Sequence, residues 1–227
     1  MNATLAGLIA ATVTFVGAHF VLSHPLRAPL VRRIGDKGFQ GLYSIVALAS
    51  FAWVVLAFQA MPVGSALWNG QGDILWALAS LLMLIAAVLL AGSFAGNPAL
   101  PAPGAADLAG KAPHGVFLVT RHPMMWSFAL WGVAHVLISP TPRVIVLAGA
   151  IVLLALIGSR LQDRKKRVAM GKTWAGWEAQ TSFWPRLARL GRAGGLPWAI
   201  GIVLWLTMTW AHLPLAYVPA GIWRWIG

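Results

Sequence analysis

The chain has 227 residues, of which 59% are hydrophobic and only 10% are charged, and its formal net charge is +12. A soluble domain usually carries about 25% charged residues to cover its surface, so this composition excludes an ordinary soluble fold. The chain contains no cysteine, which excludes disulfides, iron–sulfur clusters and thiolate metal sites.

Six apolar runs are long enough, or nearly long enough, to cross the hydrocarbon core of a bilayer as helices of about 20 residues. In chain order they are Thr4–Leu22, Phe39–Met61, Ile74–Phe94, Phe117–Ile138, Val144–Leu161 and Leu196–Leu213. No polar stretch between them could form a separate soluble domain. We therefore predict an all-α fold, a single polytopic transmembrane bundle of about six helices over residues 1–227.

Two connections between the runs carry structural signals. Pro140-Thr141-Pro142 predicts a tight hairpin between the fourth and fifth helices. The longest polar stretch, residues 160–195, places aromatic residues among Lys and Arg, which is typical of a segment at the membrane interface. These aromatic residues are Trp174, Trp177, Phe183 and Trp184.

The distribution of positive charge predicts the orientation. Of the 17 Lys and Arg residues, all except Arg143 and Arg224 lie in or beside the connections after the first, third and fifth runs. Because Lys and Arg are enriched in cytoplasmic connections, we expect these three on the cytoplasmic side and the N-terminus on the non-cytoplasmic side. The expected location is the bacterial inner membrane. The basic residues lie at helix ends, where they would attract anionic lipid, so we do not expect nucleic-acid binding.

Acidic residues are scarce and lie outside the apolar runs. They are Asp36, Asp73, Asp107, Asp163 and Glu178. A carboxylate pair or carboxylate proton relay therefore cannot form inside the bilayer. The apolar runs do hold three histidines, His19, His135 and His212. For one such histidine alone, the ordinary explanation is a neutral ring that is hydrogen-bonded to a neighbouring helix or lies near the headgroups.

Three histidines in a chain with so few acids favour a cofactor. Neutral imidazole is the commonest metal ligand and the usual axial ligand of haem. Haem also suits an apolar bundle because its porphyrin fills space there, whereas a zinc or di-iron site would use carboxylates or thiolates. We therefore expect haem as the cofactor.

A second polar signal, Thr120-Arg121-His122-Pro123, opens the fourth helix. Pro123 suits the first helical turn, where no backbone N–H is needed, and Thr120 could cap the helix. Arg121, beside free N–H groups, could hold a carboxylate or phosphate by two hydrogen bonds. An ordinary helix start with one basic residue explains the same pattern equally well. Asp163, the one acid in a basic run, is a possible partner of Arg121.

These segments resemble the NnrU family, which includes the plant and cyanobacterial 15-cis-ζ-carotene isomerases. Five blocks in the same order, spread over almost the whole chain, carry the resemblance. They are HFVLSHPLR (His19–Arg27), HGVFLVTRHPMMWSFALWGVAH (His114–His135), DRKKR (Asp163–Arg167), GKTWAGWEAQTSFWP (Gly171–Pro185) and AHLP (Ala211–Pro214).

The resemblance implies a b-type haem on two histidines and cis–trans isomerisation of a central double bond in a polyene or another small apolar substrate. Carried over to this chain, His19 and His135 would be the axial metal ligands and the catalytic residues. One departure matters. The isomerases have a cysteine three residues before the second histidine, and here that position is Gly132. Exchange of a thiolate ligand is therefore not possible.

The expected depths of the histidines favour a different pair. His135 lies 15 residues after Thr120, about 22 Å along a helix, whereas His19 should lie within ~10 Å of the cytoplasmic side. Two axial nitrogens must lie only about 4 Å apart across the iron. By depth, His212 is the better partner of His135. His19 with His135 is kept because of the resemblance, and His212 competes with His19 for the second position.

Two other functions stay open. The order Arg121-His122-Pro123, helical hairpin and aromatic block also resembles the membrane methyltransferases typified by isoprenylcysteine carboxyl methyltransferase. This likeness implies S-adenosylmethionine bound by Arg121 and His122, although the acids those enzymes carry before the block are basic here, apart from Asp163. The NnrU name is also associated with bacterial denitrification, which suggests a non-enzymatic accessory or sensor protein of nitric oxide metabolism.

Overall fold

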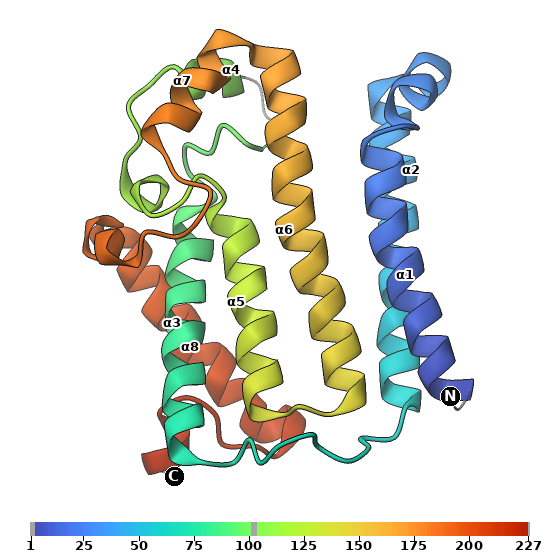
Figure 1. Ribbon diagram of the computed structural model, residues 1–227, viewed down its shortest axis with the longest axis vertical. Helices are drawn as coiled ribbons and strands as arrows, with labels where there is room; N and C mark the ends of the chain where they lie inside the picture. Colours follow the sequence, from blue (N-terminus) through green and yellow to red (C-terminus); the bar gives the residue numbers. More distant parts are fainter. Residues whose placement is uncertain (1–2, 101–103, 227) are drawn as a thin grey trace.

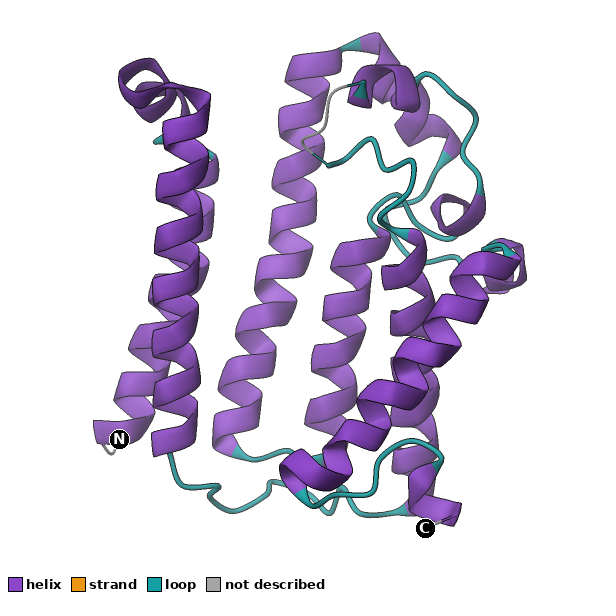
Figure 2. Cartoon of the chain, turned by 180° about the vertical axis from the view of Figure 1, so that it is seen from behind, coloured by secondary structure: helices purple, strands orange, loops and turns teal. Residues whose placement is uncertain are grey.

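The computed structural model describes residues 3–100 and 104–226, and these residues form helices and no strand (Figure 2). The α-helices and 3-10 helices (η) are α1 (Ala3–Ser23), α2 (Arg27–Ala60), α3 (Asp73–Gly92), α4 (Ala105–Ala109), η1 (Gly115–Leu118), α5 (Pro123–Ile138), α6 (Pro142–Met170), α7 (Lys172–Gln180), η2 (Leu187–Arg192), α8 (Gly195–Ala216) and α9 (Trp223–Ile226). The predicted all-α class is confirmed.

The long helices pack in the order α2, α1, α6, α5, α3 and α8. Figure 1 shows α5 between α3 and α6, the hairpin of α1 and α2 to one side, and α8 crossing α3 obliquely. α4 and α7 lie together at the end of the bundle where α1, α3 and α6 finish, which we call the α7 end. The chain termini lie toward the opposite end.

Five of the described helices, α1, α2, α3, α6 and α8, are long and apolar enough to cross a membrane. α5 is equally apolar but has 16 residues, about 24 Å of helix, which is shorter than the hydrocarbon core of a bilayer. All six predicted apolar runs are therefore found as helices, and the chain is a polytopic helical bundle of the membrane type.

Two helices continue well past the ends of their predicted apolar runs, and a third begins later than its run. α2 begins at Arg27, twelve residues before its apolar run, and is interrupted at Gly35, which has φ 72°. α6 continues to Met170 through its basic residues. Lys and Arg are good helix formers, so a change in hydropathy marks the membrane boundary but need not end a helix. α5, by contrast, begins at Pro123, because a separate 3-10 helix takes up Gly115–Leu118.

Glycines bring two pairs of helices close together. A Cβ on Gly201 of α8 would lie 2.7 Å from the Cα of Val88 in α3. A Cβ on Gly132 of α5 would lie 2.6 Å from Val152 and 3.0 Å from the carbonyl oxygen of Ala148 in α6. Small residues allow such close approach, which is a common way for membrane helices to associate.

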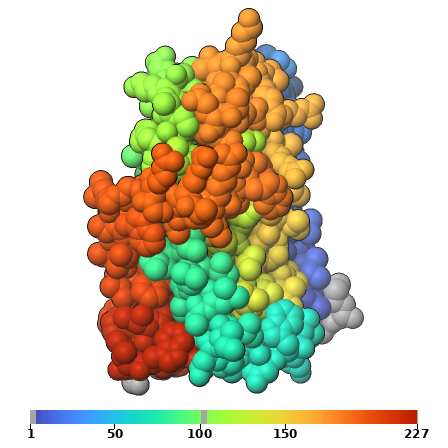
Figure 3. Space-filling view, turned by 60° about the vertical axis from the view of Figure 1, so that its left-hand side comes forward, coloured from blue at the N-terminus to red at the C-terminus, as the bar shows by residue number. Residues whose placement is uncertain are grey.

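The segment after α6 folds against the protein, and two of its tryptophans are part of the core instead of lying on a surface. Trp174 and Trp177 in α7 are buried in the same core cluster as Phe117 of η1. Trp184 is exposed. Figure 3 shows this segment, in orange, lying across the green residues before α5. The segment therefore covers the α7 end of α5 and α3.

Candidate functional site

The polar signal before α5 becomes a buried cluster at the α7 end. Pro123 occupies the first turn of α5, as predicted, so Arg121 and His122 lie just outside the helix. α6 runs alongside α5 and brings Asp163 to the same place, because helix formation continues past its apolar part. The side chains of Arg121, His122 and Asp163 expose only 11%, 0% and 3% of their surface.

Asp163 accepts hydrogen bonds from both residues. Arg121 donates from Nε (3.0 Å) and Nη2 (2.8 Å) to Oδ2. His122 donates from Nε2 to Oδ1 over 2.8 Å. The expected pair of Arg121 and Asp163 is therefore present. Because the carboxylate only accepts, the proton in this hydrogen bond belongs to Nε2 of His122.

Glu178 extends this cluster and was missed from the sequence. Its Oε1 lies 3.4 Å from Arg121 Nη2, and its two carboxylate oxygens accept from Nε and Nη2 of Arg167 at 2.7 Å each. The sequence feature that could have indicated a role for Glu178 is its rarity, because it is one of only five acids in the chain. A lone carboxylate among many cations usually has a specific partner.

Backbone and side-chain hydrogen bonds tie the segment after α7 to this cluster. The carbonyl oxygen of Phe183 accepts from Thr120 Oγ1 (2.9 Å) and from Trp126 Nε1 (2.8 Å). The Arg121 N–H donates to Ser182 at 2.8 Å. Thr120 was predicted to cap α5, but it does not. Its hydroxyl donates to the covering segment and accepts a hydrogen bond from the His122 N–H (3.3 Å).

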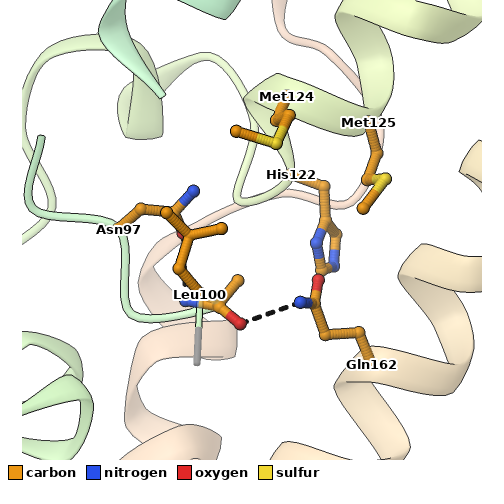
Figure 4. Close-up of a pocket in the computed structure, with 7 residues that line it drawn as sticks. Asn97, Leu100, His122, Met124, Met125 and Gln162 are labelled. Carbon is orange, nitrogen blue, oxygen red and sulfur yellow. Dashed lines mark hydrogen bonds between the residues drawn. The ribbon is translucent and has the colours of Figure 1, made fainter. Parts of the chain in front are cut away.

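A small hollow adjoins His122 (Figure 4). Its lining includes Asn97, Met124, Met125 and Gln162, and it has room for about one water molecule. Gln162 donates to the carbonyl oxygen of Ala99 at 2.8 Å, which closes one side. His122 Nδ1 is buried and has no hydrogen-bond partner among the described residues. The hollow is therefore a place where a small polar group could pair with Nδ1 of His122.

His135 and His212 lie together near the other end of the bundle. Their ring centroids are 6.3 Å apart and their planes are inclined by 34°. Each ring makes the same bond inside its own helix, since Nδ1 of His135 bonds to Trp131 O (2.8 Å) and Nδ1 of His212 bonds to Met208 O (2.7 Å). A carbonyl oxygen can only accept, so each Nδ1 carries a proton, and in the neutral form of each ring Nε2 is the lone pair that could bind a metal.

His19 lies elsewhere. It is four residues before the end of α1, which runs toward the α7 end, whereas His135 is three residues before the end of α5, which runs the other way (Figure 1). Its ring contacts Phe15 and Tyr43, with centroids 4.4 and 5.6 Å away. The structure therefore brings His135 beside His212 and leaves His19 toward the opposite end. This agrees with the argument from depth.

Gly132 explains why a cysteine is absent at its position. A Cβ there would lie 2.6 Å from Val152 Cγ2 and 3.0 Å from Ala148 O, both in α6. A thiol at this position would point into the α5–α6 contact, and the two helices would have to move apart to admit it. Glycine instead of cysteine at position 132 is therefore consistent with the close packing of α5 against α6.

The family model described as NnrU protein matches residues 7–220. The chain belongs to the NnrU family. This NnrU protein matches none of the curated proteins and none of the solved structures compared with it. The match spans all the long helices, so both the polar cluster and the histidine pair lie within the family's own region.

Proposed function

We propose that this NnrU protein is a haem b protein of the bacterial inner membrane, with His135 and His212 as the axial ligands. One observation carries the proposal: the centroids of the two imidazole rings lie 6.3 Å apart, and each ring uses Nδ1 for a bond to its own helix, which leaves Nε2 for a ligand. In a haem with two imidazole ligands the ring centres lie about 6 Å apart, from roughly 2 Å per metal–nitrogen bond and about 1 Å within each ring.

The donor set suits haem better than a bare metal ion. Among the residues that the structure describes, no three His, Asp or Glu side chains converge on a common point. Haem needs only two protein ligands because the porphyrin provides the other four. The bond from each Nδ1 to a carbonyl also fixes ring orientation and tautomer, as is usual for metal-bound histidines.

The reaction proposed for the bound haem is cis–trans isomerisation of a small apolar polyene. Haem would supply an iron centre that can exchange a ligand and perturb a nearby double bond. The chain's own contribution is an apolar setting: Trp131 stacks on His135 with ring centroids 4.2 Å apart, and α5 is apolar along its length. The chain has no cysteine, so a thiolate of this protein cannot take part in a ligand exchange.

The test is a reduced-minus-oxidised absorption spectrum of the detergent-purified protein, with pyridine haemochrome quantification. We expect near-stoichiometric haem b, lost in both His135→Ala and His212→Ala but retained in His19→Ala and in His114→Ala, a control in the loop before η1. Loss in His19→Ala with retention in His212→Ala would instead support His19 and His135 as the pair. Full haem in all variants would overturn the proposal, provided that each variant elutes as a folded species in gel filtration.

A second candidate, an S-adenosylmethionine-dependent methyltransferase, is favoured by the Arg121–His122–Asp163 cluster and by the absence of a hydrogen-bond partner for His122 Nδ1 among the described residues. Two features of the same cluster argue against a methyltransferase. Arg121 already pairs with Asp163 and Glu178, and the hollow at His122 holds about one water molecule. A colourless protein that binds S-adenosylmethionine in calorimetry would move the assignment to this function.

A third candidate is an accessory or sensor protein of nitric oxide metabolism, which would also bind haem. Spectra alone do not separate it from an isomerase. Conversion of a cis-polyene by the purified protein, followed by chromatography of the isomers, would support the enzyme. Tight binding of nitric oxide without any such conversion would support the sensor.

A further inference from the structure

The start of α5 has two backbone N–H groups without a hydrogen-bond partner. The first four N–H groups of an α-helix have no acceptor inside the helix and need one from outside it. Here the His122 N–H donates to Thr120, and Pro123 has no N–H. In the part of the chain that the structure describes, no oxygen atom accepts a hydrogen bond from the N–H of Met124 or Met125. These two N–H groups therefore remain available to a ligand.

The hollow beside His122 is lined by both of these residues. The N–H groups of an α-helix point toward its N-terminal end, which is where His122 lies. Figure 4 shows the His122 ring with Asn97 beside it and Met124 and Met125 above it. Nε2 of the ring is bonded to Asp163, and the buried Nδ1 has no partner among the described residues. Three nitrogen atoms without a partner therefore belong to residues that line one hollow.

The oxygen atoms of residues 97–100, which line another side of the hollow, already accept hydrogen bonds. Asn97 Oδ1 accepts from the Ala99 N–H at 3.0 Å, and the carbonyl oxygen of Ala99 accepts from Gln162 Nε2 at 2.8 Å. The carbonyl oxygen of Leu100 accepts from Lys166 Nζ at 3.3 Å. Because the donors at the start of α5 are unused while these acceptors are used, the hollow favours a ligand that accepts hydrogen bonds.

The charges around the hollow favour an anion. Lys166 Nζ donates to the carbonyl oxygens of Pro98 and Leu100, and within residues 3–100 and 104–226 no carboxylate forms an ion pair with it. The nearest acid, Asp163, is offset by Arg121, which binds its Oδ2 through two nitrogen atoms. The N-terminal end of a helix adds about half a positive charge. A negative ligand would therefore be attracted by Lys166 and by the start of α5.

We infer that the hollow binds a monatomic anion of the size of chloride, held by the N–H groups of Met124 and Met125 and by Nδ1 of His122. The hollow has room for about one water molecule, which excludes phosphate and carboxylate groups, and flexible methionine side chains can adjust to a slightly larger ion. When the anion is bound, the His122 ring carries both protons. Its two N–H groups then donate to two negative acceptors, the anion and Asp163.

The ion is tested by the melting temperature of the intact protein in zwitterionic detergent, with sodium chloride exchanged for sodium gluconate at constant ionic strength. Gluconate is too large for the hollow. We expect a saturable rise with chloride, as for any ligand that binds only the folded state, and a similar rise with bromide. Equal melting temperatures in chloride and gluconate would mean that the hollow holds only water. An equal rise with phosphate would mean a site for larger anions. Either result overturns the inference.

Two pairs of variants locate the ion. His122→Gln should weaken chloride binding on the order of 10–100-fold, the loss of one hydrogen bond to a charged group, and the control His114→Gln should leave it unchanged. Lys166→Gln removes the charge but keeps a donor for Pro98, and it should weaken binding by about 5-fold. Its control is Lys37→Gln, an exposed lysine of the α1–α2 hairpin. If both lysine variants respond alike, or if folded His122→Gln keeps wild-type affinity, chloride binds elsewhere and the inference fails.

Nitrogen-15 NMR of the histidine rings gives a direct readout, with the signals of His122 assigned from their absence in His122→Gln. At saturating chloride both ring nitrogens should be protonated, and exchange of chloride for bromide should shift Nδ1 more than Nε2. A ring that keeps one proton at saturating chloride would contradict the proposed contact. His135→Ala, which should lack haem, should respond to chloride like the wild type, so the chloride site and the haem proposal stand or fall separately.

Discussion

His122 and Asp163 are joined by a hydrogen bond of 2.8 Å between two side chains that expose 0% and 3% of their surface. Arg121 takes the other oxygen of the same carboxylate. One acid of α6 thus orients both residues that precede α5, and through their backbone it holds the segment that covers the α7 end. The cluster therefore stabilises the contact between α6, the start of α5 and the covering segment, and it is also a candidate binding site.

Removal of this carboxylate should destabilise the protein strongly. Asp163→Ala leaves the buried Arg121 with only the more distant Glu178, and the loss of one partner of a buried pair typically costs 3–5 kcal/mol. The free energy of unfolding can be measured by equilibrium denaturation in mild detergent. Asp73→Ala is the control, because its pair with Arg224 is 76% exposed on the acid side and should be worth at most about 1 kcal/mol. Similar losses of unfolding free energy in the two variants would show that the cluster does not stabilise the fold.

A cysteine at Gly132 should disturb the α5–α6 contact. Overpacking of this kind typically costs about 1–3 kcal/mol, because the Cβ would collide with Val152 and the Ala148 carbonyl. Gly149→Cys, on the open side of α6, should cost less in the same unfolding measurement. If Gly132→Cys is as stable as Gly149→Cys, the helices can separate freely and the packing explanation for the missing thiol is wrong.

His24 should titrate below 6.5, its ordinary pKa. Burial lowers the pKa of His24 most, followed by the positive charges of Lys165 and Arg164. The unfolded chain therefore takes up this proton first as the pH falls. Stability from the neutral ring is complete above 6.5 and is lost as the pH falls through the folded pKa. An NMR titration in zwitterionic detergent measures the midpoint, and Lys165→Ala should raise it. A midpoint that the substitution leaves unmoved would contradict the proximity of the two charges.

The bond from Trp126 to Phe183 should hold the covering segment closed. Trp126→Phe keeps a ring but removes the N–H that donates at 2.8 Å, a loss of about 1 kcal/mol, or roughly five-fold more opening. Limited trypsinolysis should then cut faster at Arg186. The control is Trp210→Phe on the exposed side of α8. Equal cleavage rates in the two variants would mean that the segment is held by its buried tryptophans alone.

The features that could be predicted from the sequence are those that depend on neighbouring residues. The six apolar runs, the hairpin at Pro140 and Pro142, and Pro123 in the first turn of α5 all appear as expected. The pairing of Arg121 with Asp163 could also be anticipated, because the chain has five acids and only one in that basic run. Because acidic residues are scarce in this chain, the contact between Arg121 and Asp163 could be predicted although the two residues are far apart in the sequence.

Other features depend on how the helices pack and could not be derived from local patterns. Trp174 and Trp177 look like interfacial residues from their neighbours, yet they are buried, because α7 turns back onto Phe117. Thr120 has the composition of a helix cap, but the covering segment offers it a carbonyl instead. In each case a partner more than 50 residues away decides the outcome.

The sequence by itself determined a polytopic helical bundle and the places of its six apolar runs, because hydropathy acts along the chain, and the order of its motifs indicated its family. It also placed three histidines at helix ends without deciding which two meet. Only the tertiary structure set His135 beside His212 and left His19 toward the other end, since that depends on the rotation and neighbours of each helix. The open space at Gly17 and Gly149 was likewise decided by packing, because whether glycine closes or opens a contact depends on what the facing helix presents.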